Sequence, residues 1–135
     1  MTTWLAGMRV TAARLNDHSV EETADTGAVA ATGWTISSFE GRRVSGVTTV
    51  NVLVTRTGAD VAQSAADSGN IAGDPTACTL PVGWRPPSTA NGNYGNGTVD
   101  GEYSINTAGV VTLRSISGAS GIVTGTNARI CCAWI

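Results

Sequence analysis

The sequence predicts an all-β protein: an antiparallel β-sandwich or jelly-roll-like head, preceded by a short N-terminal arm that contains one short helix. Three observations favour this fold. From Gly33 onward, apolar residues recur at every second position in several short segments, which is typical of strands. Turns rich in Gly and Asn separate these segments. Helical spacing occurs once, near the N-terminus, and the 135 residues suit one domain.

Residues 1–27 are expected to form the arm and a linker, and residues 28–135 the head domain. The stretch VTAARLNDH offers Thr11 as a helix N-cap, followed by good helix formers. Two turns of helix are too short to be stable alone, so this segment should pack against something. The residues expected to supply its apolar side, and to act as an anchor on a partner, are Trp4, Leu5, Val10 and Leu15.

Within the head, four segments show the two-residue period of half-buried strands: GWTISSFE, GVTTVNVLVTRTG, TVDGEYSIN and GIVTGTNARICCAWI. TAG at 107–109 is a turn signal, so VVTLRSIS should pair with the preceding strand as a hairpin. Two of the expected strands, Val47–Thr55 and Ile122–Ile135, are partly apolar on both faces. One interpretation is a further layer, formed by another part of the chain or by a neighbouring subunit, and the other is ordinary sandwich packing. The residues expected on inward faces are Trp34, Ile36, Ser38, Val50, Val52, Val54, Val99, Tyr103, Ile105, Ile122, Ile130, Cys132 and Trp134.

The stretch TLPVGWRPPS, residues 79–88, is interpreted as a corner between two strands. Pro81 cannot donate to a sheet ladder and ends the strand, while Gly83 permits a turn. Pro86 and the proline after it then force an extended exit. Trp84 should cover the end of the core, and Arg85 should point to water. A proline-rich ligand would show repeated PxxP, which this stretch lacks.

The segment NGNYGNGTVDGE, residues 91–102, is expected to be a long, flexible surface loop with Asn-Gly turns. It lacks the spacing of an EF-hand, a P-loop or a dinucleotide-binding turn. A second interpretation is a recognition loop, because loops on rigid β scaffolds commonly carry binding. Its candidate residues are Asn91, Asn93, Tyr94 and Asn96, with Tyr94 as the natural contact residue.

Nothing in the sequence marks an enzyme, and we expect no cofactor or metal. The only histidine, His18, lies in a polar segment without a marked partner. Asp100 and Glu102 would share the solvent face of a strand, where a solubilising role is favoured over glycosidase chemistry. The cysteines, Cys78 and the adjacent pair at 131–132, lack metal-ligand spacing and are read as buried small hydrophobes in a reducing cytoplasm.

The charge balance bears on partners and location. The net charge of −2 provides no electrostatic footprint for nucleic acid. No apolar run approaches the length of a membrane span, and the N-terminus does not resemble a secretory signal. All eight basic residues are Arg, which fits a GC-rich coding source.

Taken in order, GWTISSF, GVTTVNVLVTRTG, GNIA, CTLPVGWRPPS and GEYSINTAGVVTLRSISGAS resemble the β-sandwich head domain of tailed-bacteriophage surface proteins over about residues 33–135. In that family a "tLP.gyrP" segment precedes a "v.I...G.v.l" hairpin, and Trp84 stands here at the usual Tyr position. WLAGMRVTAARLND also resembles leader segments of small virion proteins from phages of actinobacteria. The positions that match the two motifs are Thr79, Leu80, Pro81, Gly83, Arg85 and Pro86, then Ile105, Gly109, Val111 and Leu113.

The resemblance implies a trimeric, non-enzymatic protein at the virion surface, assembled in the host cytoplasm. The absence of collagen-like or coiled-coil repeats favours a capsid decoration protein, anchored by its arm to the major capsid protein. The alternative is a short tail or baseplate receptor-binding protein that recognises host glycans, with the 91–101 loop as its candidate binding element. A free lectin-like carbohydrate-binding module is the third interpretation.

Overall fold

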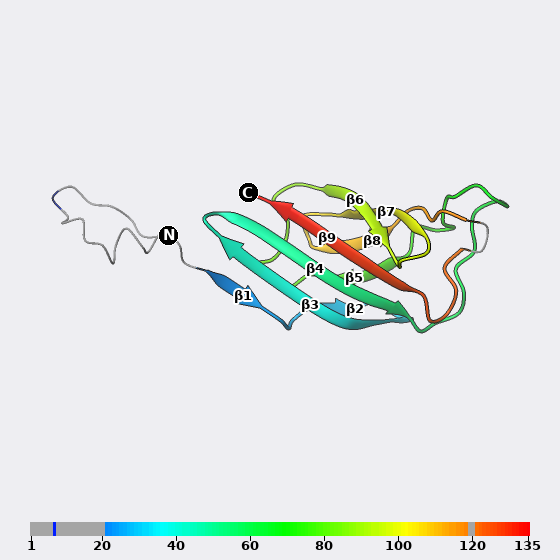
Figure 1. Ribbon diagram of the computed structural model, residues 1–135, viewed down its shortest axis with the longest axis horizontal. Coiled ribbons are helices and arrows are strands. Elements are labelled where there is room, and N and C mark those ends of the chain that lie inside the picture. The colour runs from blue at the N-terminus through cyan, green and yellow to red at the C-terminus, as the bar shows by residue number, and fades with distance from the viewer. Residues whose placement is uncertain (1–6, 8–20, 119–120) are drawn as a thin grey trace.

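The computed structural model describes residue 7 and residues 21–118 and 121–135, and these residues form nine strands and no helix (Figure 1). The all-β prediction is therefore confirmed for the described residues. The predicted N-terminal helix and the anchor residues Trp4, Leu5, Val10 and Leu15 lie outside them. The strands are β1 (Glu22–Ala24), β2 (Val29–Ala30), β3 (Trp34–Val44), β4 (Val47–Arg56), β5 (Thr76–Thr79), β6 (Ala90–Gly95), β7 (Asp100–Ile105), β8 (Val110–Leu113) and β9 (Asn127–Trp134).

The strands form one antiparallel sheet in the order β1-β3-β4-β9-β6-β7-β8-β5-β2. The β1-β3-β4-β9 half and the β6-β7-β8-β5-β2 half meet where Gly95 pairs with Arg129, the only register pair recorded between β6 and β9. The sheet curls about this junction into a half-barrel whose inner faces pack together (Figure 1). The expected sandwich of two sheets is thus replaced by one continuous sheet, because β9 pairs on both of its edges.

The core lies between the two halves of the curled sheet. Alternate residues of β4 point inward, and Val50, Val52 and Val54 are fully or almost fully buried, as their spacing predicts. The facing half contributes buried residues from β7 and β8, which form the predicted hairpin across the turn at 106–109. The principal members of this layer are Tyr103, Ile105, Val111 and Leu113, and the β9 partners are Ala128 and Ile130.

The inward face of β3 differs from the prediction because the strand contains a bulge. Its pairing with β4 shifts between Ile36 and Ser38. A bulge adds one residue to a strand and so changes which side chains face the core. Ser38 is consequently exposed, and the next residue, Phe39, is buried in its place. Strict two-residue alternation in the sequence cannot reveal such an inserted residue.

The sheet begins earlier in the chain than the expected domain boundary at residue 28. Glu22–Ala24 pair with Gly41–Arg43 of β3 as an edge strand. Two exposed ion pairs flank this ladder: Arg42 Nε lies 2.5 Å from Glu21 Oε1, and Arg43 Nη1 lies 2.7 Å from Glu22 Oε2. The polar sequence of β1 hides it from a periodicity search, because its strand character comes from pairing with β3 rather than from burial.

Tyr103 connects the two halves of the curled sheet. It extends from β7 across the interior, and its hydroxyl donates a hydrogen bond to the carbonyl oxygen of Cys131 on β9, at 2.6 Å. The ring lies over Gly92 of β6, where a Cβ atom would be 2.6 Å from the tyrosine oxygen. The hairpin partner therefore has to lack a side chain for Tyr103 to reach β9.

The cysteines differ in exposure, which corrects the expectation that all are buried. Cys78 is fully buried, Cys132 is half-buried and Cys131 is exposed. Because β9 alternates, Cys131 occupies the outer face of the sheet, opposite Asn51.

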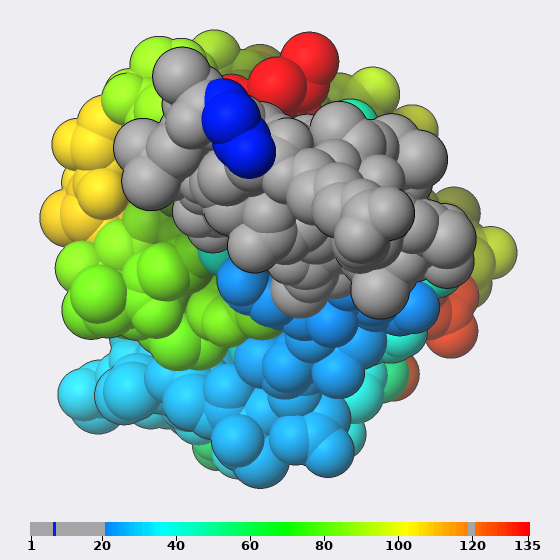
Figure 2. Space-filling view, turned by 90° about the vertical axis from the view of Figure 1, so that its left-hand side faces the viewer, coloured from blue at the N-terminus to red at the C-terminus, as the bar shows by residue number. Residues whose placement is uncertain are grey.

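The C-terminus, the β3–β4 turn and the start of β1 lie at the same end of the molecule (Figure 1). Figure 2 looks onto this end, with the C-terminal residues in red and the residues that follow position 20 in blue. Val47 at the turn and Ile135 at the C-terminus are both exposed. They lie at the same end of the molecule because their neighbours Thr48 and Trp134 pair with each other. The chain therefore enters the head beside exposed apolar side chains.

Three buried acids make stability fall at alkaline pH. Burial raises the pKa of the Cys78 thiol from 9.0 to about 12. Burial, and then the charge of Asp100, raise the pKa of Tyr94 from 10.0 to about 12. Burial, followed by the neighbouring Cys132, also raises the pKa of Tyr103. The folded protein keeps these protons at pH values where the unfolded chain releases them. The resulting contribution to the free energy of unfolding is complete below pH ~9 and is lost as the pH rises toward about 12.

We therefore expect the free energy of unfolding to fall steadily above pH ~9, measured by urea denaturation at a series of pH values. Absorbance at 295 nm should show little tyrosinate until circular dichroism reports unfolding. The Cys78→Ala variant should show a shallower alkaline decline. Titration of both tyrosines near pH ~10 in a protein that is still folded would contradict the described burial.

Candidate functional site

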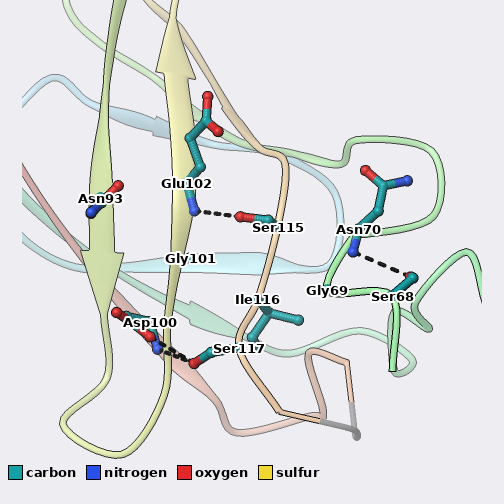
Figure 3. A pocket seen from close by; sticks show the side chains of 10 residues that line it. All are labelled: Ser68, Gly69, Asn70, Asn93, Asp100, Gly101, Glu102, Ser115, Ile116 and Ser117. Atoms are coloured by element: carbon teal, nitrogen blue, oxygen red, sulfur yellow. Dashed lines mark hydrogen bonds between the residues drawn. The ribbon is translucent and has the colours of Figure 1, made fainter. Parts of the chain in front are cut away.

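The strongest candidate site is an open polar cleft of about 510 Å³ beside the β6–β7 hairpin (Figure 3). Three parts of the chain line it: the loop residues 68–70, Asn93 of β6 with residues 100–102 of β7, and the strap, which we define as residues 115–117. In Figure 3, Asn93 stands on one side and the 68–70 loop on the other, with β7 and the strap between them.

Serine side chains, together with one backbone hydrogen bond, hold the strap against β7. The amide of Glu102 donates to Ser115 Oγ at 2.8 Å, and the amide of Asp100 donates to Ser117 Oγ at 2.9 Å. Ser117 Oγ in turn donates to Asp100 Oδ1 at 2.6 Å, and its backbone amide donates to the Asp100 carbonyl at 2.6 Å. These bonds hold both acidic residues in a defined position along the cleft floor.

A glycine and a buried tyrosine set the depth of the floor. Gly101 lies between the two acidic residues, and a Cβ atom there would overlap the carbonyl oxygen of Ser115. The same carbonyl accepts a hydrogen bond from the Tyr94 hydroxyl at 2.7 Å. Tyr94 is 3% exposed and lies beneath the cleft. Its prediction as a surface contact residue is therefore wrong: it positions Ser115 from below.

The other predicted recognition residues lie in different environments, because residues 91–102 form a hairpin rather than a long flexible loop. Asn93 lines the cleft, whereas Asn91 is exposed on the same strand outside the cleft lining. Asn96 is half-buried and stabilises the turn, since its Oδ1 accepts bonds from the amides of Thr98 and Val99, both at 2.8 Å. The periodicity search did not find β6, because Gly92 on its inner face has no apolar side chain and leaves only Tyr94 to mark that face.

The 68–70 loop is the wall that the sequence analysis missed. The carbonyl of Gly69 accepts a bond from the amide of Ile116 at 2.8 Å, and Asn70 bridges to Ser115. Gln63 supports the loop, because its Oε1 accepts from the Gly69 amide at 3.1 Å. The sequence here, SAADSGN, contains turn residues but no period that would place it against a strap more than forty residues away.

The cleft is acidic and rich in hydrogen-bonding groups. Asp100 and Glu102 lie on the solvent face of β7, as their alternation predicts, and no basic residue is among the lining residues. The Glu102 side chain makes no hydrogen bond or ion pair with the described residues. Such a site can accept and donate hydrogen bonds to a polar ligand. Among the described residues, no three His, Cys, Asp or Glu side chains are grouped to hold a metal ion.

Two further hollows lie along the β3–β4–β9 half. One, of about 520 Å³, is formed by residues 23–25 with residues 38–40 and Asn51. The other, of about 290 Å³, is formed by Leu53, Arg129 and Cys131 with their neighbours. Ser38, which follows the β3 bulge, and Asn51 line both hollows.

The TLPVGWRPPS stretch is a corner that carries packing contacts. β5 ends at Thr79, the amide of Trp84 donates to the Pro81 carbonyl at 3.1 Å, and Gly83 has a φ of +91°. Trp84 is half-buried, with its ring against Gly41 and the Arg43 guanidinium 5.1 Å from the ring centroid. Pro86 is buried.

Arg85 does not point freely into water, contrary to expectation. Its Nε donates to the Leu80 carbonyl at 3.0 Å, which closes the corner on itself. The aliphatic part of the side chain packs against Gly109 of the β7–β8 turn. The corner thus joins the two motifs that the sequence analysis treated separately, and none of its residues lines the cleft.

The close approach at Gly101 provides a test of how the cleft is built. Gly101→Ala should displace the strap and lower the free energy of unfolding by about 2 kcal/mol or more, as overpacking does. The control is Gly95→Ala in the same hairpin, where a Cβ atom would lie 3.7 Å from the Val99 carbonyl oxygen. The control should change stability by less than ~0.5 kcal/mol. Equal urea midpoints for the two variants would contradict the described contact.

No helix among the described residues is long and apolar enough to cross a membrane. No protein-family model and no curated protein matches the sequence. Among solved structures, the chain is similar to the receptor binding protein (gp15) of Listeria phage PSA, with a TM-score of 0.57 and 12% identity. The match covers 91% of this chain and 70% of the phage protein. This chain therefore has the fold of a phage receptor-binding protein.

Proposed function

We propose that this chain is a non-enzymatic surface protein of a tailed-phage virion that binds a glycan on the host cell. The observation that carries the proposal is the fold likeness to the Listeria phage receptor binding protein over 91% of the chain. The same family of phage surface heads is indicated independently by the LP-G-W-RP corner and the hairpin that follows it. Actinobacteria are the hosts to be tried first, on the strength of the Arg-only basic residues and the leader motif.

Between the two phage interpretations, this observation favours a tail or baseplate receptor-binding protein over a capsid decoration protein. The decoration hypothesis rests on the absence of shaft-like repeats and on an anchor formed by Trp4, Leu5, Val10 and Leu15, which lies outside the described residues, and the fold likeness supports neither. Receptor binding is also favoured by a feature on the head itself, the polar cleft held by the strap. A free lectin-like module would use the same cleft, but it has no comparison in its favour.

A homotrimer is part of the proposal, supported by the outer face of the β4–β9 pair. Small and apolar side chains share this face with Asn51 and Arg129: Thr49 lies opposite Ala133, and Leu53 lies diagonally across from the exposed Cys131. A neighbouring subunit would bury it, in keeping with the partly apolar second face of both strands. Glu40 and Arg129 on the same half could pair with opposite charges of another copy.

The receptor-binding proposal is tested by cell binding. A fluorescent-protein fusion of the full chain should label some strains in a panel of actinobacteria and other Gram-positive bacteria, and excess unlabelled chain should compete. Copy number in purified particles separates the interpretations further: a handful of copies at the tail supports the proposal, and hundreds on the capsid would overturn it in favour of decoration. Failure to label any strain that the phage infects would also contradict it.

The trimer is tested by light scattering on the full chain, which should give three times the mass of one chain. Introducing charge on the outer face, with Leu53→Glu and Ala133→Glu together, should yield monomers with an unchanged circular dichroism spectrum. The control is Thr76→Glu, an exposed position on β5 in the other half of the sheet, which should leave the trimer intact. A wild-type monomer at micromolar concentration would overturn this part of the proposal.

A further inference from the structure

We infer that the cleft beside the β6–β7 hairpin binds an uncharged saccharide through hydrogen bonds, and that it discriminates against anionic cell-surface polymers. The inference rests on the proposed receptor-binding function and names the ligand class and the site. It places recognition in the cleft formed by Asn93 of β6, by β7, by the strap and by the 68–70 loop, away from the corner.

The lining offers the complementary groups that sugar hydroxyls need. The carboxylates of Asp100 and Glu102 accept hydrogen bonds, the amide of Asn93 both donates and accepts, and the hydroxyl of Ser68 does the same. A carboxylate can accept hydrogen bonds from two neighbouring hydroxyls through its two oxygens, and a side-chain amide can bind such a pair through its oxygen and its nitrogen. Because the Glu102 side chain has no partner within the described residues, its two oxygens remain available to a ligand.

The charge of the cleft defines which ligands it rejects. Asp100 and Glu102 stand on the same face of β7, two residues apart, and no basic side chain among the described residues lines the cleft. Arg114, which precedes the strap, lies 3.8 Å from Asp74 through Nη2 and is not part of the lining. A phosphate or uronate group entering here would meet two carboxylates without a compensating cation, so anionic polymers should bind poorly.

The cleft floor is held in place before a ligand arrives. Ser115 is fixed from above by the amide of Glu102 and from below by the Tyr94 hydroxyl, at 2.8 and 2.7 Å. Ser117 holds Asp100 by three hydrogen bonds. Pre-organised groups lose little conformational entropy on binding, which favours a saccharide whose hydroxyls must meet several partners at once.

Within the part of the chain that the structure describes, no aromatic side chain lines the cleft, since Tyr94 is buried beneath it. A sugar is therefore expected to be held through its hydroxyl groups rather than by stacking of its ring. Hydrogen bonds exchanged with water contribute little net affinity each, so one cleft should bind weakly. Several linked copies on one virion would raise the apparent affinity by avidity, as the proposed homotrimer allows.

The experiment uses a strain that the fluorescent fusion labels. Its cell-wall polysaccharide is separated by anion exchange into an unretained, uncharged fraction and a retained, anionic fraction, and each is used to compete with labelling by the full chain. The uncharged fraction should compete at a concentration at least tenfold lower than the anionic one. Glu102→Gln and Asn93→Ala should each raise the concentration of chain needed for half-labelling by about tenfold, and Asn91→Ala, outside the cleft, should change it less than twofold.

Competition by the anionic fraction alone would overturn the inference, and so would labelling that Glu102→Gln and Asn93→Ala leave unchanged. Both outcomes leave the receptor-binding function intact, because the strain is still labelled. Absence of labelling by the wild-type chain would instead contradict the proposed function. Thermal unfolding of each variant shows whether it is folded; both substitutions are at exposed positions, so a melting temperature within a few degrees of wild type is expected.

Discussion

The curl of the sheet depends on the core packed between its two halves, and within that core Tyr103 reaches from β7 to the backbone of β9. Between β6 and β9 only the Gly95–Arg129 register pair is recorded, so the ladder there is short. The hydrogen bond from the Tyr103 hydroxyl to the Cys131 carbonyl adds a second link between the halves. It satisfies a phenol that would otherwise be buried without a partner, and leaving such a group unpaired costs about 1–3 kcal/mol.

Glycines in the β6–β7 hairpin make both the core and the cleft possible. Gly92 leaves room for the Tyr103 side chain on the inner surface, and Gly101 lets the carbonyl of Ser115 approach β7. On each strand the tyrosine two positions after the glycine contacts another element. Tyr94 on β6 bonds the strap, and Tyr103 on β7 bonds β9. The hairpin therefore serves the interior and the cleft with the same backbone, which ties the geometry of the site to the packing of the core.

The parts of the fold that sequence periodicity could predict are those in which burial alone decides the strand. β4, with three buried valines in alternation, and the β7–β8 hairpin follow directly from their patterns. β1 is a polar edge strand, β3 contains a bulge, and four of the six residues of β6 are glycine or asparagine, so their strand character comes from pairing partners rather than from their own residues. Propensity and period carry little information about such partners.

The candidate site was predictable to an even smaller extent. The sequence could place Asp100 and Glu102 on the solvent face of a strand and Asn93 in a surface loop, but a cleft requires walls, and these come from the 68–70 loop and the strap. Neither segment has a regular period, and both are placed by bonds between distant residues, such as the Ile116 amide with the Gly69 carbonyl. The burial of Tyr94 likewise follows from the tertiary position of Ser115, which no local pattern contains.

The corner contributes to the stability of the head, whereas the exposed residues that we propose for recognition in the cleft contribute little to it. In the corner, Trp84, Arg85 and Pro86 all make packing or hydrogen-bond contacts with the rest of the head, so changing them disturbs the fold. In the cleft, the exposed side chains of Asn93 and Glu102 support nothing beneath them, because Gly101, Ser115 and Tyr94 hold the backbone. Substitutions at exposed positions of this kind usually change stability by less than ~0.5 kcal/mol. A scaffold built this way can present different polar groups on the same floor, which is the property that a protein needs if it is to recognise different surface saccharides while keeping one fold.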